Sequence, residues 1–264
     1  MSEAVFEFSA SGFAPVPEEE VSTHRTLVSD SWLVTDGCTV AWDQHLARFS
    51  ASVLSETNVD QETLNAFIAE VHARTPHTGR WFPRVEVVSH SEKERLRYRH
   101  RSAPKAEPTA ILARAPYDPR TRPLVKGPDL TELLALRGAV APSGATEAII
   151  VDANDRIIEG AYSTVMVWPA DTDELVVIAP SIPRLPSVTE AVLLNIARDQ
   201  GVEVREELLS VSDLKNAEVW VVSALHGIRL ATAFVDGPAL DNTPERSSQW
   251  QEWWHSRAQP PVLA

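Results

Sequence analysis

The apolar residues of the chain recur with two different periods, which predict a mixture of helices and strands. Apolar positions at helical spacing indicate amphipathic helices over Asp43–Glu56, Gln61–Arg74 and Ser187–Gln200. Short runs of β-branched residues, such as Ile149–Val151 and Val165–Trp168, are typical of buried strands. Because helical and strand patterns follow one another along the whole chain, we expect an α/β (mixed α+β) fold.

The stretch Ile149–Trp168 carries an acidic residue between its apolar runs. The polar segment Asp152–Asp155 predicts the turn of a hairpin formed by the two runs in a buried sheet. Glu159 and Gly160 interrupt the apolar pattern that follows Ile158. A buried carboxylate needs a cation or a hydrogen-bond donor as its partner. Glu159 is therefore either a functional residue or a surface acid at the end of a strand.

Three prolines in residues 116–123 predict a connection between two halves of the chain, because proline is excluded from helix interiors and central strands. We expect an N-terminal α/β domain at 1–116, a linker at 117–123 and a C-terminal domain at 124–264. Lys126, one of four lysines, follows the apolar pair Leu124 and Val125. A lysine in apolar surroundings has a lowered pKa and can act as a nucleophile or a base, so Lys126 is a candidate catalytic residue.

Arginines alternate with other residues over Glu94–Arg101, which we interpret as a strand. A strand would place Arg95, Arg97, Arg99 and Arg101 on one face. One interpretation of this face is a solvated sheet edge, and the other is a surface that recognises carboxylate groups of a ligand. In the second case, Arg97 and Arg99 are the candidate substrate-binding residues.

Composition and charge exclude several classes of protein. With 44% apolar and 23% charged residues, the 264-residue chain is neither disordered nor collagen-like. Its net charge of −13 argues against non-specific binding to nucleic acids or anionic membranes. Cys38 is the only cysteine, which leaves no internal disulfide or cysteine-based metal site. The N-terminus lacks signal-peptide features and no apolar run is long enough to cross a bilayer, so we expect a cytoplasmic protein.

Familiar short motifs for other chemistries are absent from the sequence. No Gly-rich dinucleotide or triphosphate loop and no GxSxG segment occurs, and the eight histidines lack the spacing of metal ligands. We therefore expect neither a Rossmann dinucleotide site nor a metal centre.

Six short segments in one order along the chain carry a resemblance to a known family. They are His45–Phe49 (HLARF), Lys126, Ala145–Asp152 (ATEAIIVD), Ile158–Gly160 (IEG), Val188–Thr189 and Glu218–Leu225 (EVWVVSAL). From Arg48 to Val235 the chain thus resembles the class IV aminotransferases, which are pyridoxal-phosphate enzymes of fold type IV. The family includes branched-chain and D-amino-acid aminotransferases and 4-amino-4-deoxychorismate lyases. The chain departs from the family at Thr164, where Asn is usual, and at Glu190, where Arg is usual.

The resemblance implies a role for each matching residue. Lys126 would be the lysine that links pyridoxal 5'-phosphate covalently and moves the substrate α-proton, and Glu159 would pair with the pyridine nitrogen. Arg48 would bind the phosphate. The remaining phosphate contacts would come from Val188 and Thr189 at a helix N-terminus, where unpaired amides favour an anion, and from Ser223 and Ala224.

The resemblance also implies a fold and an activity. The expected fold is the two-domain, D-amino-acid aminotransferase-like fold of type IV, with the cofactor at the domain interface of a homodimer. The compact length and the Ser223–Leu225 loop are most similar to 4-amino-4-deoxychorismate lyases, which release pyruvate and leave 4-aminobenzoate for folate synthesis. The alternatives are a branched-chain or D-amino-acid aminotransferase and a cofactor-less, non-enzymatic relative. For an enzyme, we expect a small amino-acid-like substrate.

Overall fold

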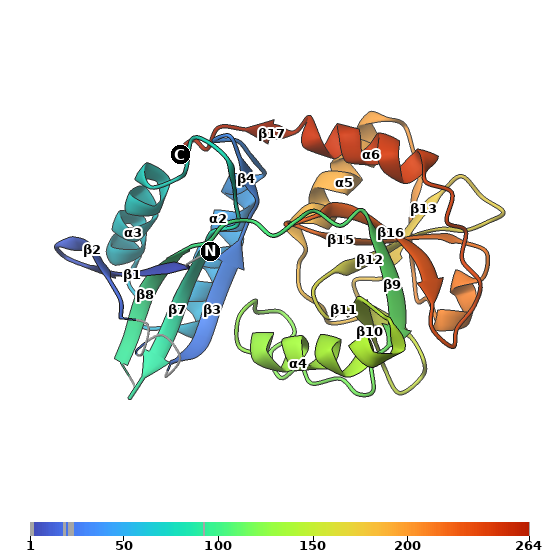
Figure 1. The fold of residues 1–264 in the computed structure, drawn as a ribbon, viewed down its shortest axis with the longest axis horizontal. Coiled ribbons are helices and arrows are strands. Elements are labelled where there is room, and N and C mark those ends of the chain that lie inside the picture. The colour runs from blue at the N-terminus through green and yellow to red at the C-terminus, as the bar shows by residue number, and fades with distance from the viewer. Residues whose placement is uncertain (1–2, 18–19, 21–23, 92, 264) are drawn as a thin grey trace. The chain divides into compact units, whose positions relative to one another are not determined.

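The computed structural model describes residues 3–17, 20, 24–91 and 93–263, and the chain forms two compact units (Figure 1). The first unit comprises three separate segments, Met1–Lys105, Val125–Pro128 and Arg257–Ala264. The second comprises Ala106–Leu124 and Asp129–Ser256. Each unit has its own sheet and its own apolar core.

The first unit contains a five-stranded antiparallel sheet with two helices packed on it (Figure 1). The helices α2 (Trp42–Glu56) and α3 (Gln61–Ala73) start and end within one residue of the predicted ranges. Phe49 and Phe67, one from each helix, are buried in the core. The strand order is β2 (Gly12–Pro15), β1 (Ala4–Ser9), β8 (Lys93–His100), β7 (Arg84–His90) and β3 (Arg25–Ser31).

Two short strand pairs complete the first unit. One joins β4 (Val34–Thr35) to β6 (Arg80–Trp81). The other joins β5 (Thr39–Val40) to β17 (Ala258–Gln259), which lies near the C-terminus. The end of the chain therefore takes part in the unit that the N-terminus begins.

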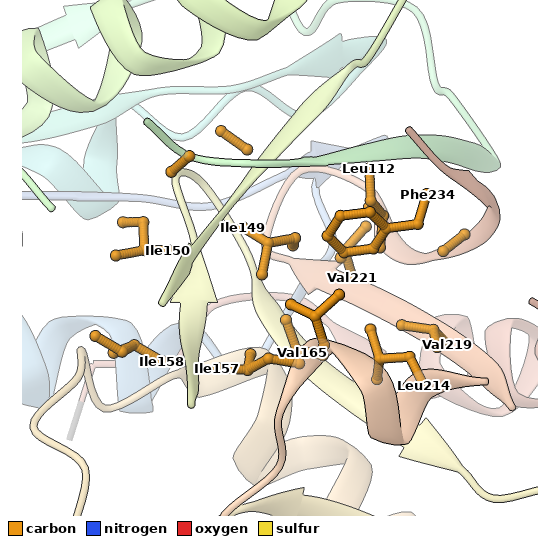
Figure 2. Packing of buried hydrophobic residues seen from close by; sticks show 14 of the residues in the cluster. Leu112, Ile149, Ile150, Ile157, Ile158, Val165, Leu214, Val219, Val221 and Phe234 are labelled. Atoms are coloured by element: carbon orange, nitrogen blue, oxygen red, sulfur yellow. The ribbon is translucent and has the colours of Figure 1, made fainter. Parts of the chain in front are cut away.

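The second unit contains an eight-stranded mixed sheet around the larger core (Figure 2). Its helices are α4 (Leu130–Val140), α5 (Val188–Asp199) and α6 (Glu245–His255), and its short 3-10 turns are η1 (Ala141–Ser143) and η2 (Val211–Leu214). The strand order is β11 (Ile157–Gly160), β10 (Glu147–Val151), β9 (Thr109–Arg114), β16 (Gly227–Phe234), β15 (Glu218–Ser223), β12 (Thr164–Trp168), β13 (Leu175–Ile178) and β14 (Val204–Glu207).

The hairpin predicted in the middle of the chain forms with a different second strand. β10 pairs with β11 around the turn Asp152–Asp155, whereas β12, predicted as its partner, pairs with β13 and β15. β11 and β12 are not neighbours in the strand order, and a turn joins them in which Gly160, the last residue of β11, forms a bridge to Ser163, the residue before β12. A Cβ atom at position 160 would collide with the Ser163 hydroxyl, so another residue there would require the Ser163 side chain to move.

The division into compact units differs from the boundaries expected from the prolines. β9 belongs to the sheet of the second unit, where it lies between β10 and β16, so this unit begins before residue 116. The expected linker at 117–123 also belongs to the second unit. Asp129 precedes α4 but makes no side-chain cap hydrogen bond to it, and instead accepts hydrogen bonds from the Thr121 amide and hydroxyl and the Arg122 amide. Lys126 belongs to the first unit.

Candidate active site

In the first unit, a fully buried carboxylate holds the arginine that the resemblance assigns to the cofactor phosphate. β3 places Asp30 against α2, which presents His45 and Arg48 one turn apart on the same face. Arg48 Nε donates to Asp30 Oδ2 and Arg48 Nη2 to Oδ1, each at 2.8 Å. His45 Nδ1 lies 2.9 Å from Asp30 Oδ1, so Nδ1 carries the proton of this contact.

Opposing effects set the charges of this cluster. Burial would raise the pKa of Asp30, but the nearby Arg48, together with His45, outweighs burial and holds that pKa well below its usual range. Burial lowers the pKa of His45, and the positive charges of Arg48 and Lys126 lower it further, while Asp30 raises it. Asp30 is therefore charged at neutral pH, and His45 favours its neutral form.

Lys126 is anchored to the same region through its backbone. Its carbonyl oxygen accepts the Ser29 amide at 2.7 Å, beside Asp30 on β3. Gly127 follows with a φ of +139°, and a Cβ atom there would lie 2.9 Å from backbone atoms of Val28 and Ser29. Only glycine permits this close approach. The fold therefore brings the predicted catalytic lysine into the same unit as Arg48, near enough for its charge to affect His45.

In the second unit, Glu159 is buried on β11, with 8% of its surface exposed, and is ion-paired. Arg120 Nη1 donates to Glu159 Oε1 at 2.6 Å and to the Pro183 carbonyl at 3.1 Å. Arg120 also binds both oxygens of Asp118, at 2.9 and 2.8 Å. Burial raises the pKa of Glu159 above its ordinary value, although Arg120 and the Leu185 amide act in the opposite direction.

The N-terminus of α5 lies directly after the loop that contacts Glu159. The Ser187 hydroxyl accepts the Glu190 amide at 3.2 Å and so caps the helix. The amides of Val188 and Thr189, the first two residues of the helix, have no partner within the helix. Arg184 forms a fork with the Glu190 carboxylate, with both contacts at 2.7 Å. Glu190 stands where the family usually has arginine, and its carboxylate thus forms an ion pair with an arginine of the preceding loop.

Ser223 and Ala224 lie where β15 ends. Ser223 pairs with Gly227 in the turn to β16, and the preceding Val222 pairs with Thr164 at the start of β12. β12 begins shortly after the Gly160 end of β11, and its first residue pairs with Val222. The Ser223 loop therefore lies at the same end of β12 as the turn that follows Glu159. Glu159, the α5 N-terminus and Ser223 all belong to the second unit.

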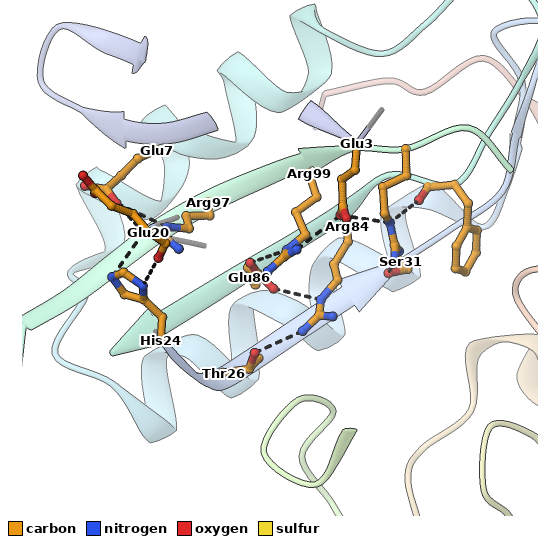
Figure 3. A network of polar contacts seen from close by, with 12 residues as sticks. Glu3, Glu7, Glu20, His24, Thr26, Ser31, Arg84, Glu86, Arg97 and Arg99 are labelled. Atoms are coloured by element: carbon orange, nitrogen blue, oxygen red, sulfur yellow. Dashed lines mark hydrogen bonds and ion pairs between the residues drawn. The ribbon is translucent and has the colours of Figure 1, made fainter. Parts of the chain in front are cut away.

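The arginines of β8 are engaged by acidic residues (Figure 3). Arg97 is 1% exposed and contacts Glu7 at 3.2 Å, while Arg99 contacts Glu86 at 2.6 Å and Glu3 at 3.3 Å. A substrate carboxylate would compete with these acids. Substrate binding by Arg97 and Arg99 stays a prediction, and the solvated-edge interpretation is wrong for Arg97, because this side chain is buried.

Two residues of these clusters were not identified from the sequence as candidates. Asp30 lies in an ordinary strand pattern, and Arg120 lies among the prolines that predict a linker. The only feature of the sequence that could have indicated Arg120 is that this charged residue stands shortly before Lys126 in the chain. Among the described residues, no group of three or more acidic, histidine or cysteine side chains is arranged to hold a metal ion. In the same part of the chain, no helix is long and apolar enough to cross a membrane.

Comparison with known sequences and structures identifies the class of protein. Residues 27–234 match the family described as Amino-transferase class IV. The chain therefore belongs to the class IV aminotransferase family, whose enzymes use pyridoxal phosphate. This confirms the family, the enzyme class and the cofactor predicted from the sequence. No curated protein matches the chain.

Solved structures share the fold at low sequence identity. A PLP-bound hypothetical aminotransferase from Mycobacterium tuberculosis is 18% identical, with a TM-score of 0.75 over 97% of this chain and 98% of its own. A fold IV-transaminase from Curtobacterium pusillum is 17% identical, with a TM-score of 0.76 over 96% and 99%. The T.th. branched-chain amino acid aminotransferase is 16% identical, with a TM-score of 0.78 over 96% and 93%. These similarities confirm the predicted fold type IV.

Each cluster, taken by itself, contains side chains whose chemistry suits one part of the cofactor. Glu159 has a raised pKa despite its contact with Arg120, so a second cationic partner such as a protonated pyridine nitrogen would stabilise its charge. The loop that donates to Glu159 leads within three residues to the first amides of α5, which have no partner within the helix. A guanidinium has five donors, so the fork between Arg48 and Asp30 does not prevent Arg48 from binding a phosphate.

Proposed function

We propose that the chain is a pyridoxal-phosphate enzyme in which Lys126 carries the cofactor and Glu159 faces its pyridine nitrogen. Arg48, the amides of Val188 and Thr189, and the loop at Ser223 and Ala224 would bind the phosphate. The observation that carries this proposal is the buried Glu159, which shares its one contacting arginine with Asp118 and whose pKa is raised by burial. When bound, the cofactor supplies an electron sink for the substrate carbanion.

The chain's own residues would divide the work as follows. Lys126 Nζ would accept the α-proton of the substrate and return a proton at the end of the reaction. Glu159 would keep the ring nitrogen protonated through a charge-assisted hydrogen bond. Arg48 would fix the phosphate end, and Asp30 would hold the Arg48 side chain in place.

We propose 4-amino-4-deoxychorismate lyase as the specific activity, with pyruvate and 4-aminobenzoate as products. The Ser223–Leu225 sequence and the compact length support it. A branched-chain or D-amino-acid aminotransferase is the second candidate, supported by the branched-chain enzyme among the similar structures. We further propose a cytoplasmic homodimer, for which light scattering of the purified protein gives the oligomeric state.

The test is the visible spectrum of the purified protein with added pyridoxal phosphate, before and after borohydride. We expect a yellow band that borohydride bleaches, and a label that peptide mapping places on Lys126. Lys126→Ala should lose the label and nearly all turnover, whereas Lys215→Ala, a matched lysine control, should keep both. A label on another lysine, or none, would contradict the proposal.

A second assay separates the two activities. Wild-type protein is incubated with 4-amino-4-deoxychorismate, and pyruvate and 4-aminobenzoate are measured. In parallel, a branched-chain or D-amino acid is supplied with 2-oxoglutarate, and glutamate is measured. Pyruvate release without glutamate formation supports the lyase, and glutamate formation alone assigns the aminotransferase.

A further inference from the structure

Arg120 makes polar contacts in the second unit that no role assigned above uses. Its side chain is 6% exposed. It donates to Glu159 at 2.6 Å, to both oxygens of Asp118 and to the carbonyl of Pro183. A guanidinium with this many fixed acceptors has one orientation, because moving it would leave several buried polar groups unpaired.

The charges of this group do not cancel. Asp118 and Glu159 contribute two negative charges and Arg120 one positive charge. Asp118, the more exposed acid, has a lowered pKa because its hydrogen bonds to Arg120 outweigh burial. The uncompensated negative charge therefore falls on Glu159, which burial disfavours. Arg184 acts on Glu159 only through its electrostatic field.

The contact of Arg120 with Glu159 is also directional. The hydrogen bond is made to Oε1, so the carboxylate plane is fixed by a neighbour that is itself fixed by Asp118. Pairing between Glu159 and a ring nitrogen requires both a set orientation and a negative charge. The hydrogen bond from Arg120 fixes the orientation of the Glu159 carboxylate, and the positive charge of Arg120 stabilises its negative charge.

We propose that Arg120 is a positioning residue that holds Glu159 oriented and negatively charged for the pyridine nitrogen of the cofactor. This inference rests on the proposed function. It makes the segment at 118–122 a support of the cofactor site rather than a passive connection. Arg120 acts through Glu159 and through one atom of the cofactor, the ring nitrogen.

The test compares two ligands, pyridoxal phosphate and its analogue with carbon in place of the ring nitrogen. Arg120→Met removes the charge at similar length, Arg120→Lys keeps the charge, and Arg122→Met is the control at an exposed arginine of the same segment. Dissociation constants are measured by absorbance titration, with circular dichroism to verify folding. We expect Arg120→Met to weaken pyridoxal phosphate about tenfold, the effect of losing one charge-assisted hydrogen bond.

The nitrogen-free analogue gives the discriminating result. We expect wild type and Arg120→Met to bind it within about twofold of each other, since the atom through which Arg120 acts is missing. Arg120→Lys should recover part of the affinity for pyridoxal phosphate, and Arg122→Met should match wild type with both ligands. If Arg120→Met does not fold, Arg120→Lys is compared with wild type instead, with a smaller loss expected for pyridoxal phosphate and none for the nitrogen-free analogue.

Other outcomes overturn the inference. Equal losses for both ligands would mean that Arg120 only supports the fold, and no loss for either would remove it from the site. Both results are distinct from failure of the proposed function, in which wild-type protein would bind no pyridoxal phosphate and give no label on Lys126.

Discussion

Each unit contains a buried carboxylate paired with an arginine, yet the two differ in charge balance. Asp30 in the first unit has Arg48 and His45 as partners, and its pKa is lowered despite complete burial. Glu159 in the second unit has one arginine, shared with Asp118, and its pKa is raised. Asp30 is thus satisfied within the chain, whereas Glu159 lacks positive charge. In these two clusters both carboxylates are ion-paired, but only that of Glu159 has a raised pKa, because its one contacting arginine is shared with Asp118 and burial outweighs it.

The largest expected effect comes from removing the satisfied carboxylate. Asp30→Ala leaves Arg48 without its buried partner and should lower the free energy of unfolding by about 3 kcal/mol. Urea unfolding at neutral pH measures this loss. Asp30 has a lowered folded pKa, so its contribution is complete above its unfolded pKa of about 4 and is lost as the pH falls through the folded value. The difference between wild type and variant should therefore shrink in acid. A loss that is independent of pH would show that packing, not charge, accounts for it.

Replacing Glu159, the carboxylate that lacks positive charge, should lower the free energy of unfolding by less than Asp30→Ala does. The pH dependence of the effect should have the opposite sign. Glu159→Gln should change the free energy of unfolding of the unliganded protein by about 1 kcal/mol or less at neutral pH, because burial already disfavours the charge. A raised folded pKa means that the contribution of Glu159 is complete below its unfolded value of about 4 and declines as the pH rises through the folded value. Wild type should thus lose stability relative to the variant as the pH rises above about 4. The same slope as for Asp30→Ala would remove the contrast between the two units.

The smallest change in the free energy of unfolding is expected for an exposed ion pair, which serves as the reference for the two buried carboxylates. Arg205 and Glu174 form an ion pair at 2.9 Å, but their side chains are 45% and 27% exposed. Glu174→Gln should change the free energy of unfolding by less than about 0.5 kcal/mol at any pH, because water screens such pairs. Urea unfolding in low and high salt measures it. A loss as large as that of Asp30→Ala would mean that burial does not determine the strength of these pairs.

Local patterns in the sequence predicted helices and strands, but they did not predict which strands pair in the sheet. The helices α2, α3 and α5 follow from the helical spacing of their apolar residues. The predicted hairpin paired β10 with β12, because periodicity identifies a strand but not its neighbour in the sheet.

The candidate site was predictable only where the resemblance supplied its residues. Arg48, Lys126 and Glu159 stand at positions of the family's motifs. Their partners Asp30 and Arg120 lie 18 and 39 residues from the residues they bind, and no local pattern connects them. Ion pairs across such separations depend on the folded backbone, so the sequence alone offered no reason to select these two residues.

The short strand β17 has a consequence for the order in which the protein is made. It pairs with β5 through Ala258 and Gln259, and His72 Nε2 lies 3.1 Å from the carbonyl oxygen of Pro261. A ribosome synthesises the chain from the N-terminus toward the C-terminus, and domains can fold as they emerge. The second unit is therefore fully synthesised while the first still lacks its last strand. The unit that begins first during translation is the last to be completed.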